Sequence, residues 1–260
     1  MGEHTAISWC HATFNPWAGC TKVSPACDFC YAETDTKRYG YCEWGKDAVR
    51  RVTSDSYWKQ PRKWNAVAEK EGLRKRVFCG SWCDVMEDRA DLDYPRSRLF
   101  EEIKYTPWID WLLTTKRPQN FRRFTPEYWH GQFGFPKNVW CITTVESPEY
   151  LWRADSVRAT RAVVCALSIE PLLADIPTIG EHLDGIDWVI VGGESGPHAR
   201  PMQADWARRI RDAAISRGIA FHFKQFGEHN ENLVKIGKKN AGRMLDGREW
   251  LEFPKVNYGN

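Results

Sequence analysis

Three cysteines lie close together near the start of the chain, in the stretch "CTKVSPACDFCYAE". Cys20, Cys27 and Cys30 follow the spacing C-x6-C-x2-C, and Pro25 restricts the loop between the first two. The two-residue gap lets the sulfurs of Cys27 and Cys30 point at one metal centre across a tight turn. Three thiolates can hold an iron–sulfur cluster that leaves one iron open, or a zinc ion that takes a fourth ligand from elsewhere. A third interpretation is that these thiols are buried as small hydrophobic groups.

The composition favours metal binding over disulfide bonds. The chain has 260 residues and nine cysteines, an odd number that cannot pair completely. Its start is polar and lacks the apolar core of a signal peptide, and no apolar run reaches the length of a membrane span. We therefore expect a cytoplasmic protein whose thiols stay reduced. The formal net charge of +3 is too small an excess to prove a nucleic-acid partner.

The remaining cysteines have two possible uses. On paper, a zinc ion could take its fourth ligand from one of several side chains: Cys10, His11, Cys42, Cys79 or Cys83. Cys141 and Cys165 lie inside apolar runs, so we expect them in the core as small hydrophobic residues. His222 alternates with Phe221 and Phe223, which favours a core histidine over a ligand.

Apolar runs that end in polar or small residues recur along the chain and predict buried parallel strands. The runs are Val77–Asp84, Trp111–Lys116, Val139–Glu146, Ala162–Glu170, Trp188–Glu194 and Ile219–Gln225. Helices are expected between them, at Glu149–Ala159, at Ala204–Arg217 before Gly218, and around Tyr57–Glu71. This alternation predicts an α/β fold, a complete or partial β/α barrel, with an open doubly wound sheet as the alternative. We expect one domain, residues 1–260, with a C-terminal extension from about residue 228.

Polar side chains follow the predicted strands at the carboxyl end of each strand. In both the β/α barrel and the doubly wound sheet, the active site lies at these ends. We expect these residues to line a pocket: Ser81, Asp84, Thr114, Thr115, Lys116, Thr144, Glu146, Ser168, Glu170, Glu194, Ser195, Lys224 and Gln225. Lys116 and Glu146 could form a pair across the mouth of this pocket. Glu170 ends a strongly apolar run, so we expect it either buried with a partner or inside the site. We take Glu170, Glu146 and Lys116 as catalytic candidates.

A three-cysteine loop after the first strand of a β/α barrel resembles the radical S-adenosylmethionine (SAM) enzymes, although their usual spacing is C-x3-C-x2-C. The resemblance implies that Cys20, Cys27 and Cys30 hold a [4Fe–4S] cluster whose fourth iron chelates SAM. It also implies that residues after the second strand grip the cofactor, here Gly80, Ser81 and Asp84. Further cofactor-binding candidates are Thr144, Gly192, Gly193 and Glu194. The two glycines would let the backbone approach a ligand closely.

A closer resemblance covers almost the whole chain. The motifs on which this resemblance rests are "ISWCHATFNPWAGCTKVSPACDFCYAE", "SIEPLL", "WVIVGGESGPHARP", "FHFKQFGE" and "GRMLDGREW". They are similar to the three-cysteine proteins of phages and prophages, a family of unknown function regarded as radical-SAM-like. This resemblance implies the cofactor and leaves the substrate open.

The resemblance implies reductive cleavage of SAM to a 5′-deoxyadenosyl radical that removes a hydrogen atom from a substrate. Basic residues interleaved with Phe121 and Phe124 suggest a nucleic acid or nucleotide, acted on in modification or repair. These basic residues are Lys116, Arg117, Arg122 and Arg123, and a second group lies near the C-terminus. An electron donor such as flavodoxin or ferredoxin is expected, with a further partner protein possible and no membrane.

Two other functions remain open at the level of the sequence. One is a nucleic-acid-binding protein stapled by zinc and without catalysis. The other is a metal-independent hydrolase of a phosphate-containing substrate, built on Glu146, Glu170 and Glu194.

Overall fold

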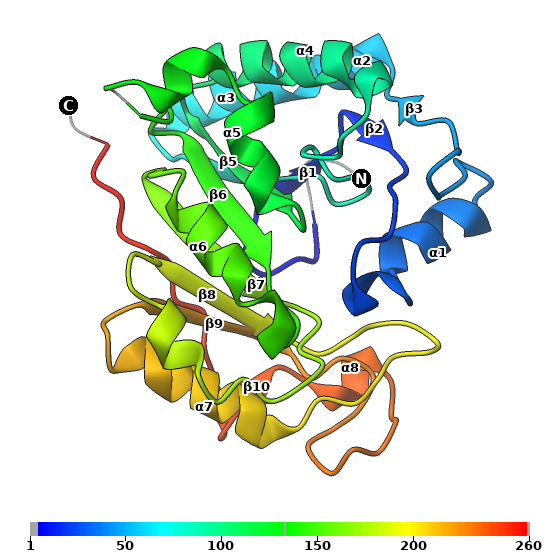
Figure 1. The fold of residues 1–260 in the computed structure, drawn as a ribbon, viewed down its shortest axis with the longest axis vertical. Helices are drawn as coiled ribbons and strands as arrows, with labels where there is room; N and C mark the ends of the chain where they lie inside the picture. Colours follow the sequence, from blue (N-terminus) through cyan, green and yellow to red (C-terminus); the bar gives the residue numbers. More distant parts are fainter. Residues whose placement is uncertain (1–4, 133, 259–260) are drawn as a thin grey trace.

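The structure is a computed structural model that describes residues 5–132 and 134–258. Seven parallel strands form one curled sheet, a half-barrel (Figure 1). In spatial order they are β1 (Ala12–Phe14), β4 (Lys75–Cys79), β5 (Ile109–Thr115), β6 (Val139–Thr144), β7 (Val164–Ile169), β8 (Trp188–Gly192) and β9 (Ala220–Gln225). Two short antiparallel ribbons accompany the sheet, β2 (Trp17–Ala18) with β3 (Arg51–Val52) and β10 (Met244–Leu245) with β11 (Arg248–Glu249).

The strand order identifies the sheet as a partial barrel. Each strand lies beside the strand that precedes it in the sheet along the chain, from β1 to β9. A doubly wound sheet reverses its strand order at a switch point, and this sheet has no reversal. Within the described residues β1 does not pair with β9, so the barrel stays open between its two edges. The predicted α/β class and the partial barrel agree with the structure, and the predicted strands each overlap an observed one, with β4 and β5 beginning two residues earlier than predicted.

The helices occupy the segments between strands. They are α1 (Tyr31–Arg38), α2 (Asp55–Trp58), α3 (Gln60–Glu71), α4 (Asp93–Lys104), α5 (Phe121–Phe124), α6 (Trp152–Arg158), α7 (Ala204–Ile215) and α8 (Lys238–Ala241). Single 3₁₀ turns lie at Pro25–Cys27, Ala90–Leu92, Pro118–Asn120, Glu127–His130, Pro148–Tyr150 and Ile179–His182. The helix predicted around Tyr57–Glu71 is divided into α2 and α3, because Pro61 opens a new first turn. No helix in the described part of the chain is both long and apolar enough to cross a bilayer.

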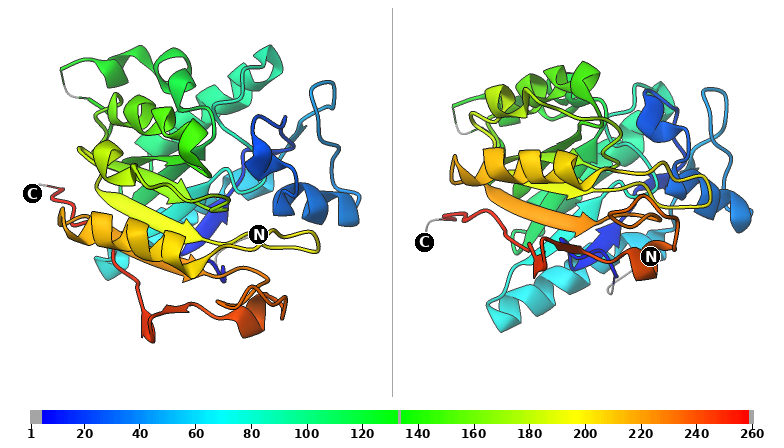
Figure 2. Two further views of the ribbon diagram at one scale, coloured as in Figure 1. Left: turned by 60° about the horizontal axis from the view of Figure 1, so that its bottom comes forward. Right: turned by 90° about the horizontal axis from the view of Figure 1, so that it is seen from below.

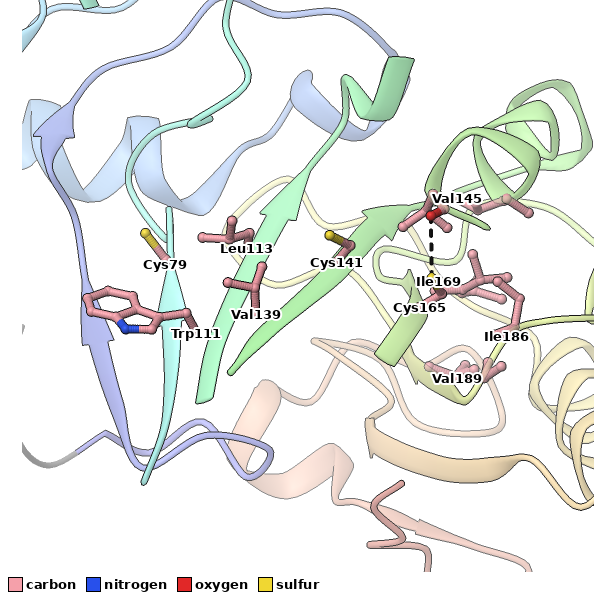
Figure 3. Close-up of a cluster of buried hydrophobic side chains, with 14 of the residues drawn as sticks. Cys79, Trp111, Leu113, Val139, Cys141, Val145, Cys165, Ile169, Ile186 and Val189 are labelled. Atoms are coloured by element: carbon pink, nitrogen blue, oxygen red, sulfur yellow. Dashed lines mark hydrogen bonds between the residues drawn. The ribbon is translucent and has the colours of Figure 1, made fainter. Parts of the chain in front are cut away.

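The outer face of the sheet packs against the helices and carries the larger core. Cys79, Trp111, Leu113, Cys141 and Cys165 lie together on this face (Figure 3). Cys141 is fully buried and Cys165 nearly so, which confirms their prediction as small core residues. Helix α7 covers β8 and β9 on the same side (Figure 2).

The inner, concave face carries a second apolar cluster, to which no described helix contributes a residue. Phe78, Leu112, Trp140 and Trp188 point to this face from β4, β5, β6 and β8, since alternate residues of a strand face opposite sides. The chain's own terminal segments cover the cluster: Ile7 and Trp9 from the start, and Phe253 and Val256 from the end. Leu251 pairs with His222 along the edge of β9, and the Trp188 Nε1–H donates to the Glu252 carbonyl at 3.0 Å. The half-barrel therefore has an apolar floor made by segments distant in the sequence.

His222 lies in this floor and is fully buried, as predicted for a core histidine. Its Nε2 is 2.8 Å from the Ser8 hydroxyl, a contact that joins the start of the chain to β9. Burial lowers the pKa of His222 to about 4 from an ordinary value of 6.5. Below pH 6.5 His222 is protonated in the unfolded chain but stays neutral in the folded chain. The free energy of unfolding therefore falls as the pH drops towards 4.

Replacing His222 with Gln should flatten this part of the pH dependence, because an amide can bond to Ser8 and does not titrate. Between pH 7 and pH 4.5 the wild type should lose about 2–3 kcal/mol more unfolding free energy than His222→Gln. Urea unfolding at the two pH values measures the difference. Parallel pH profiles for the two proteins would contradict the assignment.

Candidate functional site

A cavity of about 420 Å³ opens at the carboxyl ends of the strands, above the apolar floor. Its wall continues the inward face of the sheet: Leu112 of the floor is followed at intervals of two residues by Thr114 and Lys116. Most of the residues proposed from the sequence line it: Cys20, Cys27, Cys30, Gly80, Ser81, Asp84, Lys116, Thr144, Glu170, Gly193 and Glu194. The cavity size suits a small-molecule ligand or cofactor.

The three cysteines of the loop enter this cavity from one side. All three are free and half-buried, and the loop passes through a 3₁₀ turn at Pro25–Cys27 before α1 begins. Burial raises the pKa of Cys20 to about 12, with Asp84 adding to the effect and Arg117 opposing it. The Arg117 guanidinium donates to the Cys20 sulfur at 3.5 Å. Burial also raises the pKa of Cys30. A bound metal would therefore have to displace protons from these thiols.

Lys116 is the cation that faces the other two cysteines. Its ammonium makes no hydrogen bond or ion pair with any other described residue. Burial disfavours its charge, yet its pKa is raised because the charges of Cys27, Cys30 and Glu146 lie near it. The ammonium thus stands where it would offset thiolate charge.

The three cysteines provide three of the four thiolates that a [4Fe–4S] cluster usually takes. A cluster bound to three thiolates keeps one iron without a protein ligand, whereas a zinc ion bound to them would need a fourth ligand. Among residues 5–132 and 134–258, no three His, Cys, Asp or Glu side chains stand close enough to bind one metal ion. The three thiols line one cavity with the Lys116 ammonium near Cys27 and Cys30, so in number and chemical type they fit a cluster of this kind.

The possible fourth zinc ligands are scattered. Cys10 and Cys79 are buried in the core, and His11 accepts a hydrogen bond at Nδ1 from the Arg76 backbone N–H at 2.8 Å. Cys83 is buried and borders the cavity, while Cys42 is half-buried and outside its lining.

Asp84 lines the cavity but its carboxylate is committed to the protein. Oδ1 accepts from the Thr115 hydroxyl at 2.6 Å and from the Met86 N–H at 3.0 Å. Oδ2 accepts from Arg117 at 2.8 Å and from the Lys116 N–H at 3.1 Å. Although burial opposes its charge, these partners hold the pKa of Asp84 below its usual value. Asp84 thus connects the ends of β4 and β5, and its role as a cofactor-binding residue stays a prediction.

Glu170 and Glu194 are likewise paired with cations that the sequence did not connect to them. Glu170 forms an ion pair with Lys224 of β9, and both side chains line the cavity. Glu194, 5% exposed, is gripped by Arg200, whose Nε lies 2.8 Å from Oε2. Glu170 and Lys224 lie 54 positions apart, so spacing alone gives no signal for their pair, whereas Glu194 and Arg200 are only six positions apart.

Glu146, Gly192 and Gln225 do not belong to the cavity lining, unlike the other candidates. Glu146 is fully buried and its Oε2 accepts from Arg153 of α6 at 2.9 Å. The expected Lys116–Glu146 pair is therefore not formed, because Glu146 turns towards α6 instead. Gly192 faces the Glu170 side chain, which lies 3.4 Å from where a Cβ would be.

The glycine pair after β8 serves the protein's own packing. A Cβ on Gly193 would lie 2.0 Å from the Phe226 carbonyl oxygen, so the missing side chain makes room for backbone rather than for a ligand. The Gly193 N–H also donates to the Gln225 carbonyl at 2.9 Å. Gly193 also lines the cavity, and its role toward a cofactor stays a prediction.

The basic stretch after β5 does not form an exposed patch with interleaved aromatic rings. Phe121 and Arg117 are buried, and Lys116 lines the cavity. Arg123 is exposed and forms an ion pair with Asp88. Near the C-terminus, Lys238 lines the cavity.

Replacing Gly193 with Ala should destabilise the fold by about 3 kcal/mol or more, since backbone must move to admit a methyl group. Gly192→Ala is the matched control, because its methyl would meet only a side chain, and it should cost under about 1 kcal/mol. Thermal unfolding of both variants measures this. Equal losses would contradict the packing account of Gly193.

Comparison with known proteins identifies the family of this chain. None of the curated proteins compared with it matches. A family described as "Protein of unknown function (DUF5131)" matches residues 4–254, nearly the whole chain. The match therefore covers the cysteine loop, every strand of the half-barrel and the residues that line the cavity. The chain belongs to the DUF5131 family.

Proposed function

We propose that the protein is a radical SAM-like enzyme in which Cys20, Cys27 and Cys30 hold a [4Fe–4S] cluster. The observation that carries this proposal is that three free thiols of one loop line the same cavity as the polar strand ends. Three thiolates leave one iron without a protein ligand, which is the position where SAM would chelate. When bound, the cluster supplies the electron that cleaves SAM to a 5′-deoxyadenosyl radical. The half-barrel fold is compatible with this proposal.

The chain's own residues would bind and shield the reactants. Lys116 offsets the negative charge of the thiolates, and the hydroxyls of Thr144 and Ser168 line the adjacent wall. Glu170 and Lys224 present a carboxylate and an ammonium side by side, a pair that suits the amino and carboxylate groups of the SAM methionine part. Below them the apolar floor around Trp9 and Phe78 keeps water from the bottom of the cavity.

The substrate we propose is a nucleic acid or nucleotide, in modification or repair, as expected for a family resembling phage proteins. Support comes from Lys238 in the cavity lining and from Lys235, which donates to the Pro197 carbonyl in the loop after β8. An electron donor such as flavodoxin or ferredoxin, and the cytoplasm as the compartment, remain parts of this proposal. Binding of an oligonucleotide should weaken with added salt if phosphates are contacted.

Two alternatives draw less support from the geometry. A hydrolase would need a carboxylate free to act, but Glu146, Glu170 and Glu194 are each held by a cation. A structural zinc would need four ligands around one ion, and the described residues provide no group of three.

The decisive experiment is anaerobic reconstitution with iron and sulfide, followed by assays of iron content and of SAM cleavage products. The wild type should bind about four irons per chain and absorb broadly near ~400 nm. Cys27→Ser should lose the cluster and SAM cleavage together, because the remaining two thiolates cannot hold it.

Cys42→Ser is the matched control, since Cys42 is also a half-buried free thiol but lies outside the cavity lining. It should keep both properties. A colourless wild type with one tightly bound zinc would refute the proposal, and so would SAM cleavage that survives Cys27→Ser.

A further inference from the structure

Two loops from opposite sides of the half-barrel meet over its mouth. One is the cysteine loop, which follows β2, and the other is the loop after β8, from Gly193 to Pro201. The sheet itself does not join these sides within the described residues, because β1 and β9 do not pair with each other. Arg117 and Ser81 hold the two ends of the cysteine loop from the strand ends, and contacts between the two loops hold its middle part.

Arg200 makes these contacts. One of its terminal nitrogens, Nη2, donates to the Pro25 carbonyl at 2.8 Å, a bond between residues 175 positions apart. The other, Nη1, lies 3.6 Å from the Asp28 carboxylate. The guanidinium also lies 5.1 Å from the centre of the Phe29 ring, which packs at 5.5 Å against the ring of His198. Three groups of the cysteine loop, a carbonyl, a carboxylate and a ring, are thus held from the far side of the mouth.

Glu194 fixes Arg200 in this position. Its Oε2 accepts from the Arg200 Nε at 2.8 Å and from the Arg200 backbone N–H at 2.9 Å. Its Oε1 accepts from the Arg200 Nη2 at 2.5 Å. Glu194 is 5% exposed and directly follows the tightly packed Gly193, so the anchor is rigid. A guanidinium can grip a carboxylate with two nitrogens and still donate elsewhere, whereas a lysine ammonium cannot reproduce that fork.

The latched loop also separates two cavities. A second cavity of about 210 Å³ lies on the other side of the loop, lined by Asp28, Phe29, Cys30, His198 and other residues of both loops. Phe29, Cys30 and Gly196 border both cavities. Releasing the loop would join the two spaces and open the main cavity to solvent.

We propose that Arg200 is a positioning residue that latches the cysteine loop across the mouth of the half-barrel and sets the place of Cys27 and Cys30. What those thiols hold rests on the proposed function, but the latch itself is a property of the chain. Glu194 then acts through Arg200 as the anchor of the latch, rather than as a cofactor ligand.

The test compares Arg200→Gln, Arg200→Lys and the control Arg209→Gln in the full chain, purified without added metal. Arg209 is an exposed arginine of α7 whose Nε pairs with Asp175 at 3.0 Å, so its loss should leave the loop unchanged. Hydrogen exchange of peptides spanning residues 21–30 should become roughly tenfold faster in Arg200→Gln and rise by a smaller factor in Arg200→Lys.

Alkylation of individual cysteines distinguishes a released loop from a destabilised protein. Cys27 and Cys30 should react faster in Arg200→Gln, while the fully buried Cys79 should keep its wild-type rate. Equal acceleration at Cys79 would show global opening and overturn the latch. Unchanged exchange and alkylation in the loop would overturn it as well.

The same variants separate this inference from the proposed function. If the reconstituted wild type binds a cluster, the Arg200→Gln variant should retain its iron but bind SAM roughly tenfold more weakly. The reason is that the thiols are no longer held in a fixed position relative to the cavity wall. Unaltered SAM affinity in that variant would refute the positioning role. If the wild type binds no iron, the proposed function fails, and the exchange and alkylation results still decide the latch.

Discussion

Parallel pairing of strands in chain order is the constraint on which the site depends. Because neighbouring strands of the sheet run in the same direction, their carboxyl ends all reach one edge. Curling turns one face of this sheet inward, and the period of two assigns the same positions of each strand to that face. The strand β5 and the residue after it show the result. Leu112 belongs to the apolar floor, Thr114 to the wall of the cavity and Lys116 to its rim. The cavity is therefore an extension of the sheet's inner face.

Most polar groups at the mouth are already satisfied by the protein. Asp84 and Glu170 each neutralise a cation that comes from another strand end, and Glu194 neutralises Arg200 of its own loop. Burying a carboxylate without such a partner would cost free energy, so each carboxylate at this depth requires its cation. Among the described cavity residues, the Lys116 ammonium has no hydrogen-bond or ion-pair partner, and the Cys20 sulfur has only weak contacts with Arg117 and the Thr21 carbonyl. The side of the cavity at the cysteine loop therefore offers groups to a ligand.

The elements could be predicted from the sequence because strands buried on both faces read as continuous apolar runs. The segment Trp188–Glu194 is an example: its apolar part became β8 and its polar end reached the cavity. The partners of the polar side chains could not be predicted, since Lys224 lies 54 positions from Glu170 and Arg200 lies 175 positions from Pro25. Gly193 shows the same limit, because only the fold reveals that Phe226 occupies the space beside it.

The apolar floor ties the beginning of the chain to its last described residues. Trp9 meets Trp188 with ring centres 6.3 Å apart, and Phe253 packs on Trp188 at 5.4 Å. During synthesis from the N-terminus, the inner face of the sheet must wait for the segment around Phe253 before it is shielded from water. Until then, four strands present Phe78, Leu112, Trp140 and Trp188 to solvent. The period of greatest exposure to aggregation therefore falls late in synthesis, after the sheet has formed and before its floor is covered.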